Sequence, residues 1–252
     1  MINWLDDYCN RSGAEGFVVG VSGGVDSALC STLAAATGRP TLCVELSIHQ
    51  PEAHVARADR HIEWLRSEFD NVESECIDLT APFDSLMATL PSGEGERYDL
   101  ASANTRSRLR MASLYFLACR RNALVVGTGN KIEDYGIGFF TKYGDGGVDL
   151  SPIGDLTKTQ VFAVASFLGV GHDILSAAPT DGLFGDDRTD ENQIGASYPE
   201  LEWAMEQFGR GAKADDFEGR NREVFEIFSR RNRANRHKVD PVPVCIIPEE
   251  YK

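Results

Sequence analysis

The fold of this chain is decided by the sequence Val18-Val19-Gly20-Val21-Ser22-Gly23-Gly24-Val25-Asp26-Ser27, in which an apolar run gives way to a small polar loop. Residues 17–21 form a short run without polar side chains, which is typical of a parallel strand buried on both faces. From Asp26 onward apolar residues recur at helical spacing, until Gly38 and Pro40 supply a stop signal. The stretch therefore predicts a strand, a loop and a helix in succession.

The loop between this strand and helix has the chemistry of a phosphate site. Gly23 and Gly24 let the backbone approach a ligand closely, and the start of the helix presents unpaired amides to an anion. Ser22 and Ser27 add hydroxyl donors. A P-loop would carry a lysine, whereas this loop carries Asp26, and an acid beside phosphates implies a metal ion. The alternative is a plain turn in which Asp26 or Ser27 caps the helix.

Strands and helices alternate along the rest of the chain. Strands are expected at 40–46, 72–79 and 124–129, and helices at 2–11, 51–69, 80–90, 101–121, from 158 to the stop at Gly169, 201–208 and 218–235, before an extended end at 241–244. Such alternation indicates βαβ units with right-handed crossovers. We therefore expect an α/β protein with a doubly wound, Rossmann-like parallel sheet flanked by helices, which binds ligands beyond the carboxyl ends of its strands.

Composition narrows the class of substrate. The 252 residues carry a formal net charge of −14, which repels nucleic acid and favours a small metabolite. No stretch has the pattern of a secretory signal or a membrane span, so we expect a cytoplasmic protein without a membrane partner. The six cysteines stand singly and are interpreted as small core residues in a reducing compartment: Cys9, Cys30, Cys43, Cys76, Cys119 and Cys245.

A second polar region follows the strand expected at 124–129. It reads Gly127-Thr128-Gly129-Asn130-Lys131-Ile132-Glu133 and then Phe139-Phe140-Thr141-Lys142-Tyr143-Gly144-Asp145-Gly146-Gly147-Val148-Asp149. Aromatic side chains beside a lysine and two aspartates favour a lined pocket, although an ordinary surface loop would account for any one of these residues. The region lies at the same sheet edge as the phosphate loop.

Two later segments have alternative interpretations. The acidic, turn-rich loop at 178–191 is either a disordered connector or a lid, and we favour a lid at about residues 179–195. Thr189 or Asp190 is expected to cap a helical turn at 191–194. The segment 230–238 is a basic patch in an acidic chain, which suits a solvated helix end, a nucleic-acid patch or a site for an anionic dinucleotide.

These motifs together carry a family resemblance. The phosphate loop resembles that of the N-type ATP pyrophosphatases. The two polar stretches and a later His237-Lys238 pair follow it in the order found in NAD synthetases, and the chain looks like the ammonia-dependent form. The matches run from about Trp4 to about Lys238. The resemblance implies an adenine nucleotide alpha hydrolase-like fold with residues 1–252 as a single synthetase domain.

The resemblance also implies site residues. ATP, the co-substrate, would be held by Gly20, Ser22, Gly23, Gly24, Asp26, Ser27, Thr128, Lys158 and Thr180. Deamido-NAD would be held by Arg108, Lys142, Asp149, His237 and Lys238. Asp26 and Glu133 would bind Mg²⁺, which prefers a few hard oxygen ligands, and Asp26, Lys142 and Lys158 would serve catalysis. The segment 134–138 is one residue longer than the family pattern, so Asp134 stays open as an alternative to Glu133.

The implied reaction joins ammonia to deamido-NAD. The nicotinate carboxylate would attack the α-phosphate of ATP, pyrophosphate would leave, and ammonia would displace AMP from the adenylate. Free ammonia is the implied nitrogen source, because the pattern begins almost at the N-terminus and leaves no room for a nitrilase-like glutaminase domain. A homodimer is also implied, with the helix at 101–121 as a candidate interface. The other hypotheses are a different adenylate-forming amide ligase and a nucleotide-binding sensor.

Overall fold

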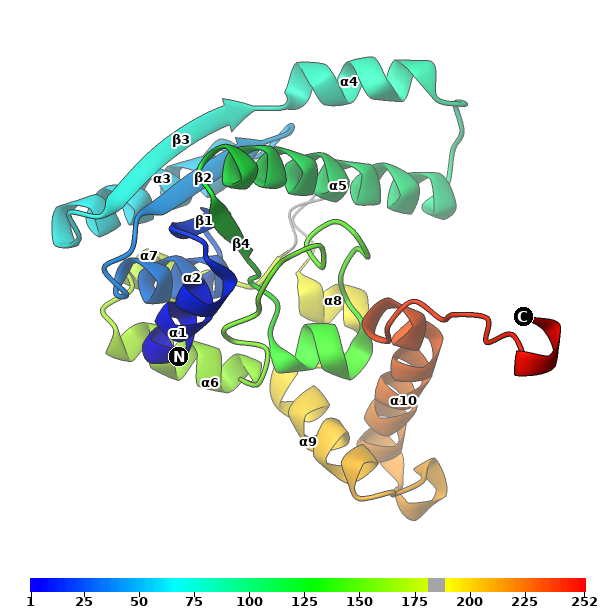
Figure 1. Cartoon of the computed structure of the whole chain (residues 1–252). Helices are drawn as coiled ribbons and strands as arrows, with labels where there is room; N and C mark the ends of the chain where they lie inside the picture. Colours follow the sequence, from blue (N-terminus) through cyan, green and yellow to red (C-terminus); the bar gives the residue numbers. More distant parts are fainter. Residues whose placement is uncertain (181–188) are drawn as a thin grey trace.

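The computed structural model describes residues 1–180 and 189–252. Its centre is a parallel sheet with the strand order β3-β2-β1-β4 (Figure 1). The strands are β1 (Gly16–Gly20), β2 (Thr41–Ser47), β3 (Val72–Asp78) and β4 (Ala123–Val126). The chain moves outward from β1 to β3 and then returns to the other side of β1, so the switch point where such folds bind ligands lies at the carboxyl ends of β1 and β4.

Helices surround the sheet. Those before and between the strands are α1 (Ile2–Ser12), α2 (Val25–Ala35), α3 (Glu52–Glu68), α4 (Thr80–Thr89) and α5 (Glu96–Arg120). After β4 come the π-helix η1 (Lys131–Ile137), α6 (Lys158–Phe167), α7 (His172–Leu175), α8 (Asp190–Ile194), α9 (Tyr198–Gly209), the turn η2 (Ala214–Asp216), α10 (Gly219–Val239) and the turn η3 (Glu249–Tyr251).

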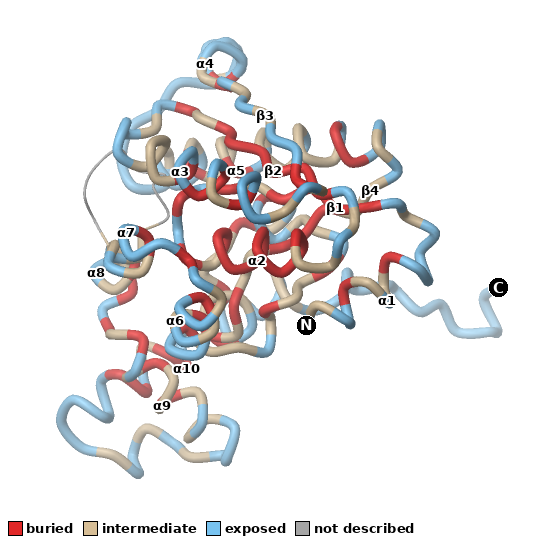
Figure 2. Tube along the Cα trace, turned by 90° about the vertical axis from the view of Figure 1, so that its left-hand side faces the viewer, coloured by how far each residue is buried: buried red, intermediate tan, exposed pale blue. Residues whose placement is uncertain are grey.

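The central strand is buried on both faces, as its unbroken apolar sequence requires. Phe17 and Val19 pack into a core with α1, α2 and α6, whereas Val18 packs with Leu42 of β2 and with α4 and α5 on the opposite face. The buried part of the trace is concentrated in β1, β2 and α2, and the C-terminal segment is exposed (Figure 2). The doubly wound α/β sheet expected from the sequence is confirmed.

A helical layer beside the sheet supports η1 (Figure 1). Ile132 and Ile137 of η1 pack with Leu201 of α9 and Phe228 of α10 in a cluster separate from the two cores on the sheet faces. These apolar contacts hold the side of η1 that faces α9 and α10. The polar residues Glu133 and Asp134 are thereby left on the side of η1 that lines the pocket at the carboxyl edge of the sheet.

The ends of several expected elements differ in the structure. The helix expected at 101–121 begins at Glu96, because Glu96 and Asp99 in the first turn interact favourably with the helix dipole. β4 ends at Val126, since residues 127–129 leave the sheet and Thr128 turns to a pocket. The short helix α7 was not expected. Either Thr189 or Asp190 was expected to cap the helical turn near 191–194, and in the structure Thr189 is the N-cap of α8.

The interpretation of the cysteines is wrong for three of the six. Cys9, Cys30 and Cys43 are buried, but Cys76, Cys119 and Cys245 are exposed. Cys76 lies on the edge strand β3 and Cys245 in the extended C-terminal segment, so neither position has a layer packed over it.

The last two expectations concern the lid and membrane spans. Residues 181–188, the middle of the lid expected at about 179–195, lie outside the described residues. None of the helices in the described ranges combines the length and the apolar character that a membrane span requires.

Candidate active site

The loop after β1 is folded by its own serines. The amide of Ser22 donates to Oγ of Ser27 at 3.1 Å, and that hydroxyl donates to the carbonyl of Gly24 at 2.9 Å. Gly23 has φ +80°, and a Cβ there would lie 2.8 Å from the carbonyl oxygen of His54, so only glycine fits. Gly24 is the N-cap of α2, and within the described residues no side chain caps it. The capping alternative for Asp26 and Ser27 is therefore wrong.

Asp26, Glu133 and Lys158 meet beside this loop. The ammonium Nζ of Lys158 lies 2.6 Å from Oδ2 of Asp26 and 2.9 Å from Oε1 of Glu133. The Lys158 side chain is only 3% exposed, while those of Asp26 and Glu133 are 17% and 15% exposed. Asn130 donates to the other oxygen of Asp26 at 3.1 Å. The structure thus places one cation between two carboxylates that come from distant segments.

Burial and charge act against each other in this cluster. Burial would raise the pKa of Glu133, but the nearby ammonium of Lys158 and donors from Tyr198 and Asn130 outweigh it and lower the pKa. Burial would lower the pKa of Lys158, but the two carboxylates outweigh it and raise the pKa. Burial raises the pKa of Asp26 despite the ammonium. The charged form of the Lys158–Glu133 pair is favoured at neutral pH.

Glu133 and Asp134 lie in the π-helix η1. A π-helix holds about one residue more per turn than an α-helix, so this local bulge would accommodate the extra residue that was expected in the segment after Glu133. The side chain of Asn130 caps it by accepting from the amides of Ile132 and Glu133. The Asp134 carboxyl lies against Gly129, where a Cβ would be 1.8 Å from its Oδ2. Both acids line the pocket, but Glu133 is the one that shares Lys158 with Asp26.

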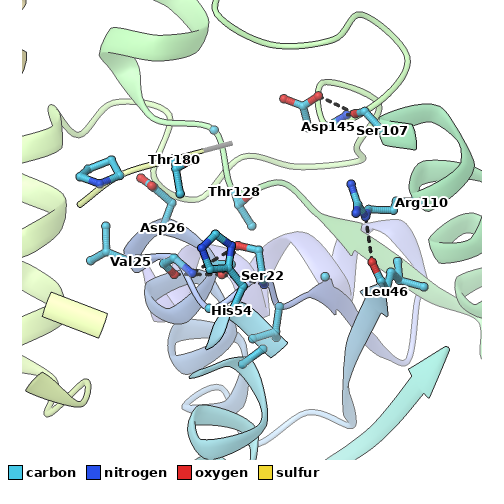
Figure 3. Close-up of a pocket in the computed structure, with 18 of the residues that line it drawn as sticks. Ser22, Val25, Asp26, Leu46, His54, Ser107, Arg110, Thr128, Asp145 and Thr180 are labelled. Atoms are coloured by element: carbon cyan, nitrogen blue, oxygen red, sulfur yellow. Dashed lines mark hydrogen bonds between the residues drawn. The ribbon is translucent and has the colours of Figure 1, made fainter. Parts of the chain in front are cut away.

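A pocket of about 300 Å³ opens at this edge of the sheet, as Figure 3 shows. One wall contains every residue that was predicted to hold ATP: Gly20, Ser22, Gly23, Gly24, Asp26, Ser27, Thr128, Lys158 and Thr180. The opposite wall is formed by Leu46 of β2, by Gln50, which follows that strand, and by Arg110, Met111 and Leu114 of α5. The pocket thus joins the phosphate loop to a partly apolar chamber.

Arg110 and Asp145 are the prominent polar groups away from the phosphate loop (Figure 3). Arg110 donates to the carbonyl of Leu46 at 2.8 Å, and burial lowers its pKa to about 10, so it stays charged. Asp145 accepts from the hydroxyl of Ser107 at 2.7 Å and from the amide of Thr141 at 3.0 Å. Burial raises the pKa of Asp145. Of these two, sequence reasoning missed Arg110 as a pocket residue.

The five residues predicted to hold the dinucleotide lie outside the described lining of this pocket: Arg108, Lys142, Asp149, His237 and Lys238. Lys142 donates to the carbonyl of His237, and Arg108 approaches the carbonyl of Lys142 at 3.4 Å. Lys238 donates to the carbonyl of Phe140 at 2.7 Å. These four form one basic cluster where the end of α10 meets the segment after η1.

Asp149 stands apart from that cluster. Its carboxylate accepts from the amide of Val125 at 2.8 Å and from the hydroxyl of Tyr115 at 3.0 Å, so it fastens the end of β4 to α5. Within one chain, the Asp149 carboxylate therefore serves to join β4 and α5. Its predicted contact with a dinucleotide stays a prediction.

The chain is similar to known proteins over its whole length. The model of the NAD synthase family matches residues 1–242. The NH(3)-dependent NAD(+) synthetase of Methanosarcina mazei is 37% identical over 256 residues, which cover 100% of this chain and 96% of the relative. The same enzyme of Archaeoglobus fulgidus is 38% identical over 247 residues, covering 96% and 93%. The solved NMN synthetase from Francisella tularensis matches with a TM-score of 0.83 at 33% identity, covering 98% and 95%.

Proposed function

Because the chain belongs to the NAD synthase family, we propose that it catalyses the ATP-dependent amidation of deamido-NAD by ammonia, giving NAD, AMP and pyrophosphate. The observation that carries this proposal is the Lys158 ammonium held between Asp26 and Glu133 at the mouth of the phosphate loop. A polyphosphate that is to be cleaved needs cationic partners at fixed positions, and two carboxylates beside a lysine are a place where a metal cation would bind next to the phosphates. In a protein that uses ATP, the cytoplasm is the compartment we expect.

The loop and the chamber support ATP binding. The first amides of α2 carry no side-chain cap among the described residues and belong to residues that line the pocket, which suits a pyrophosphate group. The chamber between Leu46 and Met111 offers apolar walls for a nucleoside. We assign the triphosphate to the loop and the adenosine to this chamber.

The same carboxylates fit Mg²⁺. Asp26 and Glu133 already share one cation, and Mg²⁺ is usually bound by one or two carboxylates together with substrate phosphates and water. Across the described residues no group of three potential metal ligands occurs, which also agrees with a site that the substrate completes. When bound, Mg²⁺ would neutralise charge on the phosphates.

The residues of the chain act mainly by positioning and by charge. The nicotinate carboxylate attacks the α-phosphorus, the bond to pyrophosphate breaks, and ammonia then displaces AMP from the acyl adenylate. Lys158 faces the developing charge on the phosphates. Asp145 lines the pocket whereas Asp149 does not, so we assign to an oxygen of Asp145 the proton that ammonium loses before attack.

The placement of the basic cluster supports a homodimer. Arg108, Lys142, His237 and Lys238 lie outside the lining of the pocket in a single chain, and α5, which carries Arg108, is a candidate interface helix. We propose that a second copy brings such groups to each pocket. Light scattering of the purified protein tests this point, since a monomer at assay concentration would contradict it.

A second candidate substrate is nicotinate mononucleotide. The observation that favours it is the likeness to an NMN synthetase at 33% identity over nearly the whole chain. The reaction at the nicotinate carboxylate would be identical, and only the adenylyl half of the substrate would be missing. The two candidates therefore share every role assigned to Asp26, Glu133 and Lys158.

One product assay separates these functions. Purified protein is incubated with ATP, Mg²⁺, ammonium and either deamido-NAD or nicotinate mononucleotide, and the products are followed by chromatography. NAD formed with equal AMP and pyrophosphate, only when ammonium is present, supports the proposal. A preference for the mononucleotide supports the second candidate. AMP formed with neither substrate, but with other carboxylates, would indicate a different adenylating ligase. The variant Asp26→Asn is the inactive control.

A further inference from the structure

Tyr198, the first residue of α9, touches three charged groups of the site. Its hydroxyl donates to Oε1 of Glu133 and lies 3.2 Å from Oδ2 of Asp190. The ammonium of Lys158 lies 4.9 Å from the centre of its ring. The residue is only 4% exposed. No motif pointed to it, because a lone tyrosine after a serine carries no chemical signature in a sequence.

The surroundings of Tyr198 hold its ring firmly. Ser197 and Glu200 form a capping box, in which the Ser197 amide donates to Glu200 at 2.8 Å, and Arg220 holds Glu200 at 2.7 Å. The amide of Tyr198 itself donates to Glu191 at 2.9 Å. The hydroxyl therefore has a fixed position relative to the pocket.

The hydroxyl is also a permanent donor. A phenol ionises only at about pH 10, so the hydroxyl keeps its proton at neutral pH and donates it to Oε1 of Glu133. A phenol has one proton to donate, and the shorter of its two contacts is the one with Oε1 of Glu133, whereas Oδ2 of Asp190 lies 3.2 Å away. The hydrogen bond therefore fixes the position of that one oxygen of the Glu133 carboxylate.

Glu133 needs such a guide because its backbone is unusual. It lies in the π-helix η1, whose bulge changes the direction of the side chains. Lys158 orients the carboxylate only while the ammonium stays between Asp26 and Glu133. When another cation takes that place, the Tyr198 hydroxyl remains as a donor on Glu133.

We propose that Tyr198 is a positioning residue that holds the Glu133 carboxylate toward Asp26 for the cation that this pair binds. The inference deepens the proposed function, since it takes the pair as the Mg²⁺ site. It adds a group that acts through Glu133 and contacts neither substrate.

The test is the variant Tyr198→Phe, which removes one oxygen and keeps the ring in its apolar cluster. Binding of Mn²⁺, an oxygen-preferring stand-in for Mg²⁺, is measured by electron paramagnetic resonance without turnover. The titration includes α,β-methylene-ATP, whose bridging carbon prevents release of pyrophosphate. Loss of a group that orients a metal ligand weakens binding roughly 10–100-fold, so we expect the Mn²⁺ dissociation constant to rise by about tenfold or more.

The matched control is Tyr115→Phe, which removes a tyrosine hydroxyl from a carboxylate away from the pocket, Asp149. We expect its Mn²⁺ dissociation constant to stay within twofold of the wild type. In kinetics, Tyr198→Phe should raise the Mg²⁺ concentration for half-maximal rate and leave the KM of the nicotinate substrate unchanged. A purely structural role would lower the Tm of the metal-free protein without changing Mn²⁺ binding.

The outcomes are distinguishable from those of the function assay. Unchanged Mn²⁺ binding in Tyr198→Phe, with folding verified by circular dichroism, overturns the positioning role even if the wild type makes NAD. Weakened Mn²⁺ binding supports that role even if the wild type amidates a different carboxylate. The two proposals can therefore fail separately.

Discussion

Replacing Lys158 by methionine tests the charge cluster most directly. Methionine keeps an unbranched apolar stem but removes the ammonium that lies 2.6 Å from Asp26 and 2.9 Å from Glu133. Two carboxylates then face each other in a site where the lysine was only 3% exposed. Breaking a buried ion pair by removing one partner costs about 3–5 kcal/mol. A protein of this size loses roughly 2–4 °C of Tm per kcal/mol.

The assay is thermal unfolding at neutral pH in buffer treated to remove metals. The control is Lys131→Met in the neighbouring π-helix, because Lys131 pairs at 2.8 Å with Asp155, whose side chain is 96% exposed. An exposed pair contributes only about 0–1 kcal/mol. We therefore expect a large fall in Tm for Lys158→Met and almost none for the control.

Added Mg²⁺ provides the decisive comparison. If Asp26 and Glu133 form a cation site, the ion takes the place of the lost ammonium, and Mg²⁺ raises the Tm of Lys158→Met more than that of the wild type. Equal shifts in both proteins would refute the assignment of the pair as a cation site. A variant within about 1 kcal/mol of the wild type in metal-free buffer would refute the buried-pair argument itself.

Three further perturbations have defined outcomes. Gly129→Ala places a Cβ 1.8 Å from Oδ2 of Asp134, so the Asp134 carboxyl must move within the pocket beside Glu133, and the product assay should show reduced AMP release in a protein with normal circular dichroism. Burial lowers the pKa of His61 from 6.5 to about 4, so the free energy of unfolding should fall by up to about 3 kcal/mol as the pH drops from 6.5 to about 4. Denaturant unfolding across this pH range checks it, and His61→Gln should lose this pH dependence. Lys142→Ala should raise the KM of the dinucleotide more than that of ATP in steady-state kinetics, and equal effects would contradict its predicted role.

The fold could be predicted because its signals are local. The apolar run before Ser22 and the stop at Gly38 each lie within a few residues of the structure they determine. Alternation of strands and helices then leaves few topologies. The site is different, since Asp26, Glu133 and Lys158 come from segments far apart in the chain, and only the family resemblance brought them together in advance.

One face of α5 lines the pocket, and the spacing of residues along this helix is enough to identify that face. Residues two positions apart on a helix point to different sides, and the described lining of the pocket contains Arg110 without Arg108. Arg110 shares its helix face with Ser107, Met111 and Leu114, at spacings of three and four residues. That face could have been identified as the pocket wall. The π-helix could not be predicted, because one surplus residue expected after Glu133 does not indicate a type of helix.

The acidity of the pocket leads us to expect that a cation accompanies the nucleotide. Within the described lining, acidic side chains outnumber basic ones: Asp26, Glu45, Glu133, Asp134, Asp145 and Asp190 against Arg57, Arg110 and Lys158. Lys158 is already shared by two carboxylates, so that cluster keeps a net negative charge and does not attract a polyphosphate by itself. A metal ion bound by these carboxylates would reverse this sign and make the site attractive to phosphates. The nucleotide is therefore expected to bind as its metal complex, and free ATP to bind weakly.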